Sequence, residues 1–221
     1  DEVYTLRGEL LKILPSLQIY ELDLNGVNRA RNFGLERSRG DVVFFIDDDC
    51  AFETPGSIDR HIQLHNSQPE VLAIGGGYKL PDVAGYFDRI YNLIQMRWFY
   101  SGFTGNQINN SFETSHLLGG NFSIKKELSL THKISFEESI AYGSSEYDYF
   151  IQARNKNLPM RAVDAEVLHF TDENFTSIAK KVFLQGVGKK ILDLKYKGEF
   201  GVAESDEELK LNTADKLFMI F

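Results

Sequence analysis

A short apolar run followed by three aspartates constrains the fold of this chain more than any other feature. Residues 42–46, Val-Val-Phe-Phe-Ile, are continuous, rich in β-formers and bounded by polar residues. Such a run is typical of a strand that is buried on both faces, as in a parallel sheet. In open α/β sheets, ligands bind beyond the carboxyl ends of the strands, and Asp47, Asp48 and Asp49 stand at such an end. The pattern predicts polar chemistry at one sheet edge.

Helix and strand patterns alternate along most of the chain. We expect helices over residues 6–14, 28–39, 57–65, 86–100, 146–155 and 177–195. We expect strands over residues 18–24, 42–46, 71–74, 117–124 and 160–170. The polar residues 101–114, rich in Asn and Gly, are expected to form a mobile loop. This order predicts a Rossmann-like α/β/α sandwich with a mostly parallel sheet.

Composition narrows the classes of function. The chain has 221 residues and a net charge of −8, which argues against bulk nucleic-acid binding because that needs a basic face. Cys50 is the single cysteine, so no internal disulfide can form, and this fits a reducing compartment such as the cytoplasm. The sequence contains no apolar run of about 20 residues, so no membrane span is predicted. No signal peptide is recognisable, and without an initiator methionine we expect a fragment or a processed product.

The three aspartates suit a metal. Side chains alternate along an extended backbone, so Asp47 and Asp49 are expected to point one way and Asp48 the other. Two carboxylates on one side repel unless a cation lies between them or one takes a proton. Mg²⁺ prefers carboxylate oxygens and shares its sphere with substrate phosphates. The pair therefore suits a metal-bridged diphosphate, and the alternative is that these are loop or helix-cap residues.

Four motifs in sequence resemble those of the family 2 glycosyltransferases, which have the GT-A fold. The order and spacing agree over roughly residues 18–190. The first motif is Asn-Arg-Ala-Arg-Asn-Phe-Gly at 28–34, with Arg-Gly-Asp at 39–41 and Phe-Ile-Asp-Asp-Asp at 45–49. The others are Leu-Gly-Gly-Asn-Phe-Ser-Ile-Lys-Lys at 118–126, Tyr-Gly-Ser-Ser-Glu-Tyr-Asp-Tyr at 142–149 and Val-Leu-His at 167–169.

The resemblance implies inverting transfer of a sugar from a nucleoside diphosphate sugar, with UDP-sugars favoured and Mg²⁺ or Mn²⁺ as cofactor. Asp47 would contact the nucleotide and Asp49 would ligate the metal. His169 would lie near the diphosphate as a further metal ligand. Glu146 would be the general base. Asp148, which matches a later aspartate of the family, competes with Glu146 for a catalytic role, and a helix start is the alternative reading of both.

Other residues of these motifs are implied to support the donor. Gly119 and Gly120 would let the backbone approach the donor sugar, with Asn121 offering an amide. Arg31 and Asn32 would support the donor site, with Arg31 near the diphosphate. The alternatives are an ordinary turn and an ordinary helix surface. Four further histidines are expected at the surface and receive no role: His61, His65, His116 and His132.

Two departures from the family pattern affect the site and the domain bounds. The family's acidic pair reads Ser145-Glu146 here, and its first strand, with the segment that grips the base and ribose, has no counterpart. We therefore expect an N-terminally incomplete GT-A domain over residues 1–197 and an extension of uncertain structure over 198–221. A catalytically degenerate sugar-nucleotide-binding scaffold is one alternative function. A metal-dependent nucleotidyltransferase is the other.

The second half of the expected helix at 177–195 bears on acceptors and partners. The run Gln-Gly-Val-Gly-Lys-Lys at 185–190 resembles that of nonprocessive members, so we expect transfer of one or a few sugars to a saccharide or lipid-linked acceptor. Lys180, Lys181, Lys189 and Lys190 suit peripheral contact with an anionic membrane, at the inner face in a cytoplasmic protein. A solvated helix face is the alternative. Assembly into a homo-oligomer stays open.

Overall fold

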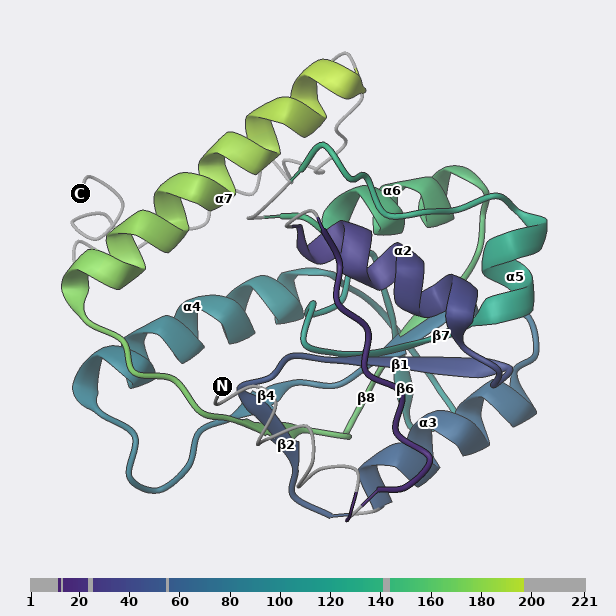
Figure 1. The fold of residues 1–221 in the computed structure, drawn as a ribbon, viewed down its shortest axis with the longest axis horizontal. Helices are drawn as coiled ribbons and strands as arrows, with labels where there is room; N and C mark the ends of the chain where they lie inside the picture. The colour runs from purple at the N-terminus through teal and green to yellow at the C-terminus, as the bar shows by residue number, and fades with distance from the viewer. Residues whose placement is uncertain (1–11, 13, 24–25, 55, 141–143, 197–221) are drawn as a thin grey trace.

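The computed structural model describes residues 12, 14–23, 26–54, 56–140 and 144–196. Strands lie at the centre and helices pack around them (Figure 1). In this view α2 (Val27–Arg37) and α6 (Tyr147–Asn155) lie above strands β1 and β7, and α3 (Gly56–Ser67) lies below them. The remaining helices are α4 (Tyr86–Ser101), α5 (Lys126–Thr131) and α7 (Phe175–Lys195). The predicted α/β class is confirmed.

The larger sheet contains six strands in the order β1-β7-β3-β8-β6-β5. Their bounds are β1 Val42–Ile46, β7 Asn121–Lys125, β3 Ala73–Gly75, β8 Met160–Val163, β6 Ser111–Thr114 and β5 Phe103–Ile108. The prediction of a mostly parallel sheet is wrong, because β7 runs antiparallel to both β1 and β3, and β3 with β8 is the one parallel pair described in this sheet. An apolar run reports burial on both faces and says nothing of strand direction.

A smaller sheet carries one side of the site. It contains β2 (Cys50–Phe52), β9 (Val167–His169) and β4 (Tyr78–Lys79), in that order. The strand expected over residues 160–170 is therefore two strands in two sheets, separated at residues 164–166. A backbone hydrogen bond from residue 165 to the carbonyl of Val163 closes the tight bend between them. After the bend, β9 pairs with β2, which follows the end of β1 closely in the chain.

The segment expected to be a mobile loop is a β-hairpin. Strands β5 and β6 pair antiparallel across residues 103–114. The two residues between them, Asn109 and Asn110, have φ of 49° and 59°. Asparagine tolerates this left-handed region and makes the tight turn that joins two twisted strands. The polar composition therefore concealed a hairpin whose turn residues were visible in the sequence.

Three other expected elements differ or lie outside the described residues. Residues 18–23 form no strand, since no described strand pairs with them and alternation alone supplies no hydrogen-bond partner. The strand expected from residue 117 begins at Asn121, after a turn at the two glycines. The helix expected over 6–14 lies almost wholly outside the described residues, and the extension 198–221 lies wholly outside them.

Two histidines expected at the surface are fully buried between α3 and β7. The Nδ1 atom of His61 lies 2.8 Å from Oγ of Ser123, and Nε2 of His65 lies 3.0 Å from the same oxygen. Burial lowers the pKa of His61 to about 3 and that of His65 to about 4. Their spacing at i and i+4 on one helix face matches a buried face, which a surface assignment ignored.

These histidines make stability depend on pH. Each pKa in the folded chain lies below the ordinary value of 6.5, so the unfolded chain binds more protons between pH 6.5 and about 3. Their contribution to stability is fully present above pH 6.5 and is lost as the pH falls toward 3. The fall in the pKa of His61 from 6.5 to about 3 corresponds to about 5 kcal/mol over the full window. We expect the difference in unfolding free energy between pH 7 and pH 4.5, from urea titration, to shrink in His61→Leu. His132→Leu is the control, and an undiminished difference in His61→Leu contradicts the assignment.

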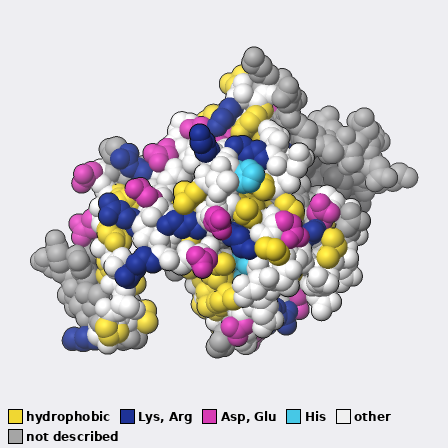
Figure 2. All heavy atoms as spheres, turned by 90° about the vertical axis from the view of Figure 1, so that its right-hand side faces the viewer, with side chains coloured by type: hydrophobic (Ala, Val, Ile, Leu, Met, Phe, Trp, Pro, Cys, Tyr) yellow, Lys and Arg dark blue, Asp and Glu magenta, His cyan; other side chains and the backbone are white. Residues whose placement is uncertain are grey.

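Charged residues are mixed over the side of the molecule where α5 lies. Figure 2 shows acidic and basic side chains interspersed on that face, with hydrophobic side chains scattered among them. Among the described residues, no helix combines the length and the apolar character that crossing a membrane requires.

Candidate active site

A cavity of about 440 Å³ lies where the end of β1 meets α2, α4 and the start of α6. Arg31 enters it from α2, residues 47–49 from the turn after β1, and Trp98 from α4. Gly119 lies in the turn before β7, and Glu146 immediately before α6. The cavity therefore gathers residues from three of the four motifs noted in the sequence.

The aspartates lie in a turn. The backbone N–H of Cys50 donates to the carbonyl of Asp47 at 3.0 Å, so the chain reverses over residues 47–50. The argument from an extended backbone is therefore wrong, although Asp47 and Asp49 do face the same cavity. Asp48 is exposed and also borders it. A turn, rather than alternation, brings the carboxylates together.

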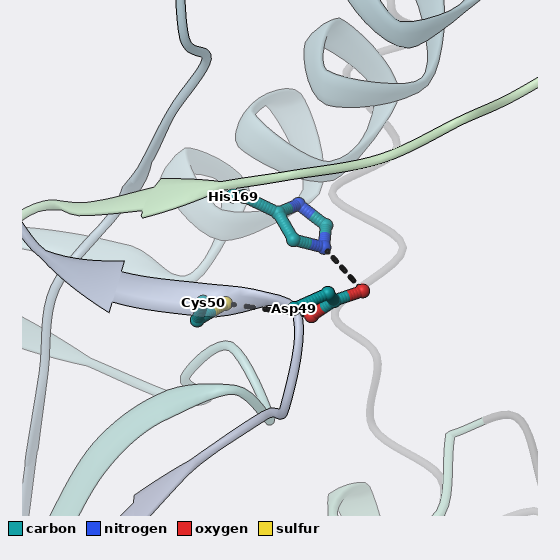
Figure 3. A group of neighbouring side chains, drawn as sticks. All are labelled: Asp49, Cys50 and His169. Carbon is teal, nitrogen blue, oxygen red and sulfur yellow. Dashed lines mark hydrogen bonds and ion pairs between the residues drawn. The ribbon is translucent and has the colours of Figure 1, made fainter.

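Asp49 meets His169 across two paired strands (Figure 3). Antiparallel pairing of β2 with β9 sets Cys50 opposite His169, and Nε2 of His169 lies 3.3 Å from Oδ2 of Asp49. The hydrogen bond from His169 lowers the pKa of Asp49. The Tyr78 ring packs against the His169 ring with centroids 4.4 Å apart, which holds the imidazole in place.

The donor atoms of this group fit a divalent cation. One atom each from Asp49, Cys50 and His169 lie within 4.8 Å of one another. Carboxylate oxygen and imidazole nitrogen are ligands of Mg²⁺ and Mn²⁺ type sites, whereas thiols select softer metals. Burial and the neighbouring carboxylates raise the pKa of the Cys50 thiol, so it stays protonated and donates to Asp49 at 3.7 Å. Asp49 and His169 are therefore the two residues that would hold the ion.

Arg31 lies between two carboxylates that line the cavity. Its side chain is 9% exposed, and its guanidinium donates to the carbonyl of Gly119 at 3.0 Å and to Oγ of Ser145 at 3.3 Å. The same group lies 3.8 Å from Oδ1 of Asp47 and 3.7 Å from Oε2 of Glu146. One buried cation thus holds a carboxylate from β1 and another from the start of α6 in fixed relation.

Asp47 packs against a glycine that leaves no room for a side chain. A Cβ atom at Gly120 would lie 2.4 Å from Oδ2 of Asp47 and 2.6 Å from the Tyr78 hydroxyl. The Gly120 N–H donates to that hydroxyl at 2.8 Å. Burial raises the pKa of Asp47, and the Arg31 guanidinium opposes this shift. The absence of a side chain at Gly120 therefore leaves the space that the Asp47 carboxylate occupies.

Glu146 lines the cavity and does not cap α6 with its side chain. It occupies the position before α6, yet its side chain makes no cap hydrogen bond. Oγ of Ser145 donates to Oε2 of Glu146 at 3.0 Å. The side chain is 17% exposed and borders the cavity, so a hydroxyl inside the cavity can reach the carboxylate.

Five residues expected at the site do not line the cavity. Gly120 and His169 contact the cavity residues Asp47 and Asp49, and the other three lie elsewhere. Asp148 is fully buried, and it is held by Lys195 at 3.0 Å and by the hydroxyl of Tyr196 at 2.7 Å. The Asn121 amide donates to the carbonyls of residues 77 and 165 at 3.1 and 2.9 Å. The Asn32 side chain is bonded to the backbone N–H and carbonyl of residue 136, both at 2.9 Å. These polar groups join parts of the fold.

Several cavity residues received no role from the sequence. Tyr78 and Tyr91 line the cavity, and α7 contributes Gln185. Trp98 also borders it, half-buried, with its ring centroid 4.0 Å from that of His116. The sequence could have indicated Trp98 through its place as a large aromatic residue on the less buried side of α4. Tyr78 gave none, because its partners lie 42 or more residues away in sequence.

The fold is of the GT-A type, the fold of many glycosyltransferases. Residues 6–130, more than half of the chain, match the model of glycosyl transferase family 2, and the chain belongs to this family. A search of curated proteins gave no match.

Solved structures share the fold at low identity. GalNAc-T7 with UDP, GalNAc and Mn²⁺ superposes with a TM-score of 0.57 at 11% identity, over 76% of this chain and 35% of that one. Residues 1–349 of TarS from S. aureus, solved with UDP-GlcNAc, give a TM-score of 0.55 at 15% identity, over 79% of this chain and 47% of that one. Mannosyl-3-phosphoglycerate synthase from Rubrobacter xylanophilus gives a TM-score of 0.53 at 20% identity, over 81% of this chain and 54% of that one. The chain thus spans between about a third and just over half of these proteins.

Proposed function

We propose that this chain is the catalytic part of an inverting, metal-dependent glycosyltransferase that moves a sugar from a nucleoside diphosphate sugar to a hydroxyl acceptor. The observation that carries the proposal is the Arg31 bridge, because one guanidinium group lies against both Asp47 and Glu146 in the wall of one cavity. The domain spans residues 1–197 in this proposal, and the acceptor is a saccharide or a lipid-linked saccharide.

Glu146 acts as the general base in this proposal. The acceptor oxygen attacks the anomeric carbon, its proton passes to the Glu146 carboxylate, and the bond from that carbon to the diphosphate oxygen breaks. Attack opposite to the leaving group inverts the anomeric centre. The hydrogen bond from Ser145 and the nearby Arg31 guanidinium hold the carboxylate in one orientation and favour its charged form.

The leaving group lies beside Asp47 and Asp49 in this proposal. Asp49 and His169 would ligate Mg²⁺ or Mn²⁺, which when bound neutralises charge on the departing diphosphate. Asp47 lies beside Arg31 and contacts the nucleotide in this proposal. UDP-sugars are the favoured donors, and two proteins of similar fold were solved with UDP or UDP-GlcNAc.

The second candidate function is a domain that binds sugar nucleotides without turning them over. Ser145 favours it, because this serine stands at a position where the family has an acidic residue. A donor assay with Mn²⁺ on the full-length protein separates the two. Release of UDP from a UDP-sugar, accelerated by an acceptor, supports the transferase. Metal-dependent UDP binding without turnover supports the scaffold, and release of pyrophosphate from a nucleoside triphosphate supports a nucleotidyltransferase.

Gly120→Ala tests the packing around Asp47. The added methyl displaces the end of the Asp47 side chain and the Tyr78 hydroxyl, because both would otherwise lie closer to the new Cβ atom than van der Waals contact allows. We expect KM for the donor to rise about 10-fold or more, as expected for loss of one charge-assisted contact worth about 1.5–3 kcal/mol. Gly34→Ala, where a Cβ meets nothing within 4 Å, is the control. An unchanged KM in Gly120→Ala contradicts a role of Asp47 in donor binding.

A further inference from the structure

The outward side of α7 carries a continuous apolar stripe. Its exposed apolar residues recur at steps of four, four and three: Phe183, Val187, Ile191 and Leu194. Phe183 and Leu194 are 70% and 69% exposed. The opposite side of the helix holds the buried Gly188 and Leu192. A helix that packs by one side alone needs one apolar side, and α7 has two.

The stripe is interleaved with positive charge. α7 contains five lysines and one aspartate, a net charge of +4, in a chain whose net charge is −8. Lys180 and Lys190 are exposed and stand three residues before and seven after Phe183, so they share the side of the stripe. Lys189 is exposed too, but it lies well around the helix from the stripe. Lys181 differs, since it pairs with Glu173.

We propose that this side of α7 binds the surface of a membrane that contains anionic lipid. Phenylalanine and leucine side chains enter the boundary between headgroups and acyl chains, while lysines meet anionic headgroups. The rest of the chain is acidic, so a negatively charged surface attracts this helix and repels the other faces. A second copy fits less well, because symmetric packing of α7 on itself brings these lysines toward one another.

The same helix borders the cavity. Gln185 lines it from α7, whereas Phe183 faces outward. An α-helix with its side chains is about 10–12 Å across, so the membrane surface would lie about one helix diameter from the cavity. Where the proposed function also holds, this placement favours an acceptor presented at the membrane. The binding itself does not depend on that function.

Vesicle co-sedimentation of the full-length protein tests the proposal. We expect at least about 10-fold tighter binding to vesicles of phosphatidylcholine with 30% phosphatidylserine than to phosphatidylcholine alone, weakened by raising salt from about 0.1 to 0.5 M. Replacing both Phe183 and Leu194 with serine reduces binding at least about 10-fold. Replacing both Lys180 and Lys190 with glutamate abolishes the preference for phosphatidylserine. Leu130→Ser, 57% exposed on α5, is the matched control.

Circular dichroism of each variant confirms that it folds. Absence of binding by the wild-type protein, or binding that the α7 substitutions leave unchanged, overturns the proposal. A dimer in solution that Phe183→Ser with Leu194→Ser converts to a monomer, without vesicle binding, assigns the stripe to a second copy and overturns it as well. Donor turnover plays no part in these readouts, so failure here leaves the proposed function standing.

Discussion

Glu146→Gln is expected to lower kcat about 10²–10⁴-fold while the donor binds nearly as before. Glutamine keeps the size of the side chain and a hydrogen-bond acceptor for Ser145, but it takes no proton from the acceptor. The carboxylate borders the cavity and makes no cap bond, so α6 loses no structural support. Steady-state kinetics with a saturating UDP-sugar and Mn²⁺ measure the loss, and UDP titration measures binding.

Asp148→Asn provides the contrast for Glu146. Asp148 is fully buried and accepts hydrogen bonds from Lys195 and Tyr196, so its replacement by asparagine weakens these contacts and destabilises the fold by about 1–3 kcal/mol. Its turnover per folded molecule should stay within a few-fold of the wild type. If Asp148→Asn abolishes turnover while Glu146→Gln retains it, the roles assigned to the two residues are wrong.

Asp49→Asn is expected to cut turnover about 10²–10³-fold and to weaken Mn²⁺ binding at least about 10-fold. The amide keeps the shape of the side chain but loses the charge that a hard cation prefers. It also loses the charged partner of His169, which lies 3.3 Å away. Turnover against Mn²⁺ concentration, together with electron paramagnetic resonance of free Mn²⁺, gives both quantities.

Asp48→Asn is the matched control for Asp49. The two residues are adjacent in the same turn, but Asp48 is exposed and is not part of the group formed with Cys50 and His169. We expect its turnover and Mn²⁺ dependence to change by less than about 3-fold. Equal losses in the two variants would show that the general negative charge of the turn matters and that no specific ligand is present.

The sequence predicted local features well and long-range partners poorly. Strand β1 and its aspartates were evident from the continuous apolar run, although β1 is only partly buried in the described residues and lies at one end of the larger sheet. Arg31 and Glu146 came from the family resemblance, and the structure brings both to the cavity. The antiparallel course of β7 left no trace in the pattern, since a buried strand reads the same in either direction.

Residues that match a motif but act in the fold were the hardest to separate. Asp148 stands two positions after Glu146, which is about half a turn of helix, so its side chain is directed to Lys195 and Tyr196 on the other side. Asn121 follows the glycines of its motif, but two backbone carbonyls take its amide hydrogens. Both outcomes depend on partners more than 40 residues away, which composition and periodicity do not reveal.

A crystal grown with UDP and Mn²⁺ tests the central claim most directly, through the anomalous scattering of manganese. The account predicts one peak within about 2.0–2.3 Å of an Asp49 carboxylate oxygen and of Nε2 of His169, with diphosphate oxygens completing the sphere. Ordered UDP in the cavity with manganese bound elsewhere, or with no manganese at all, would contradict it.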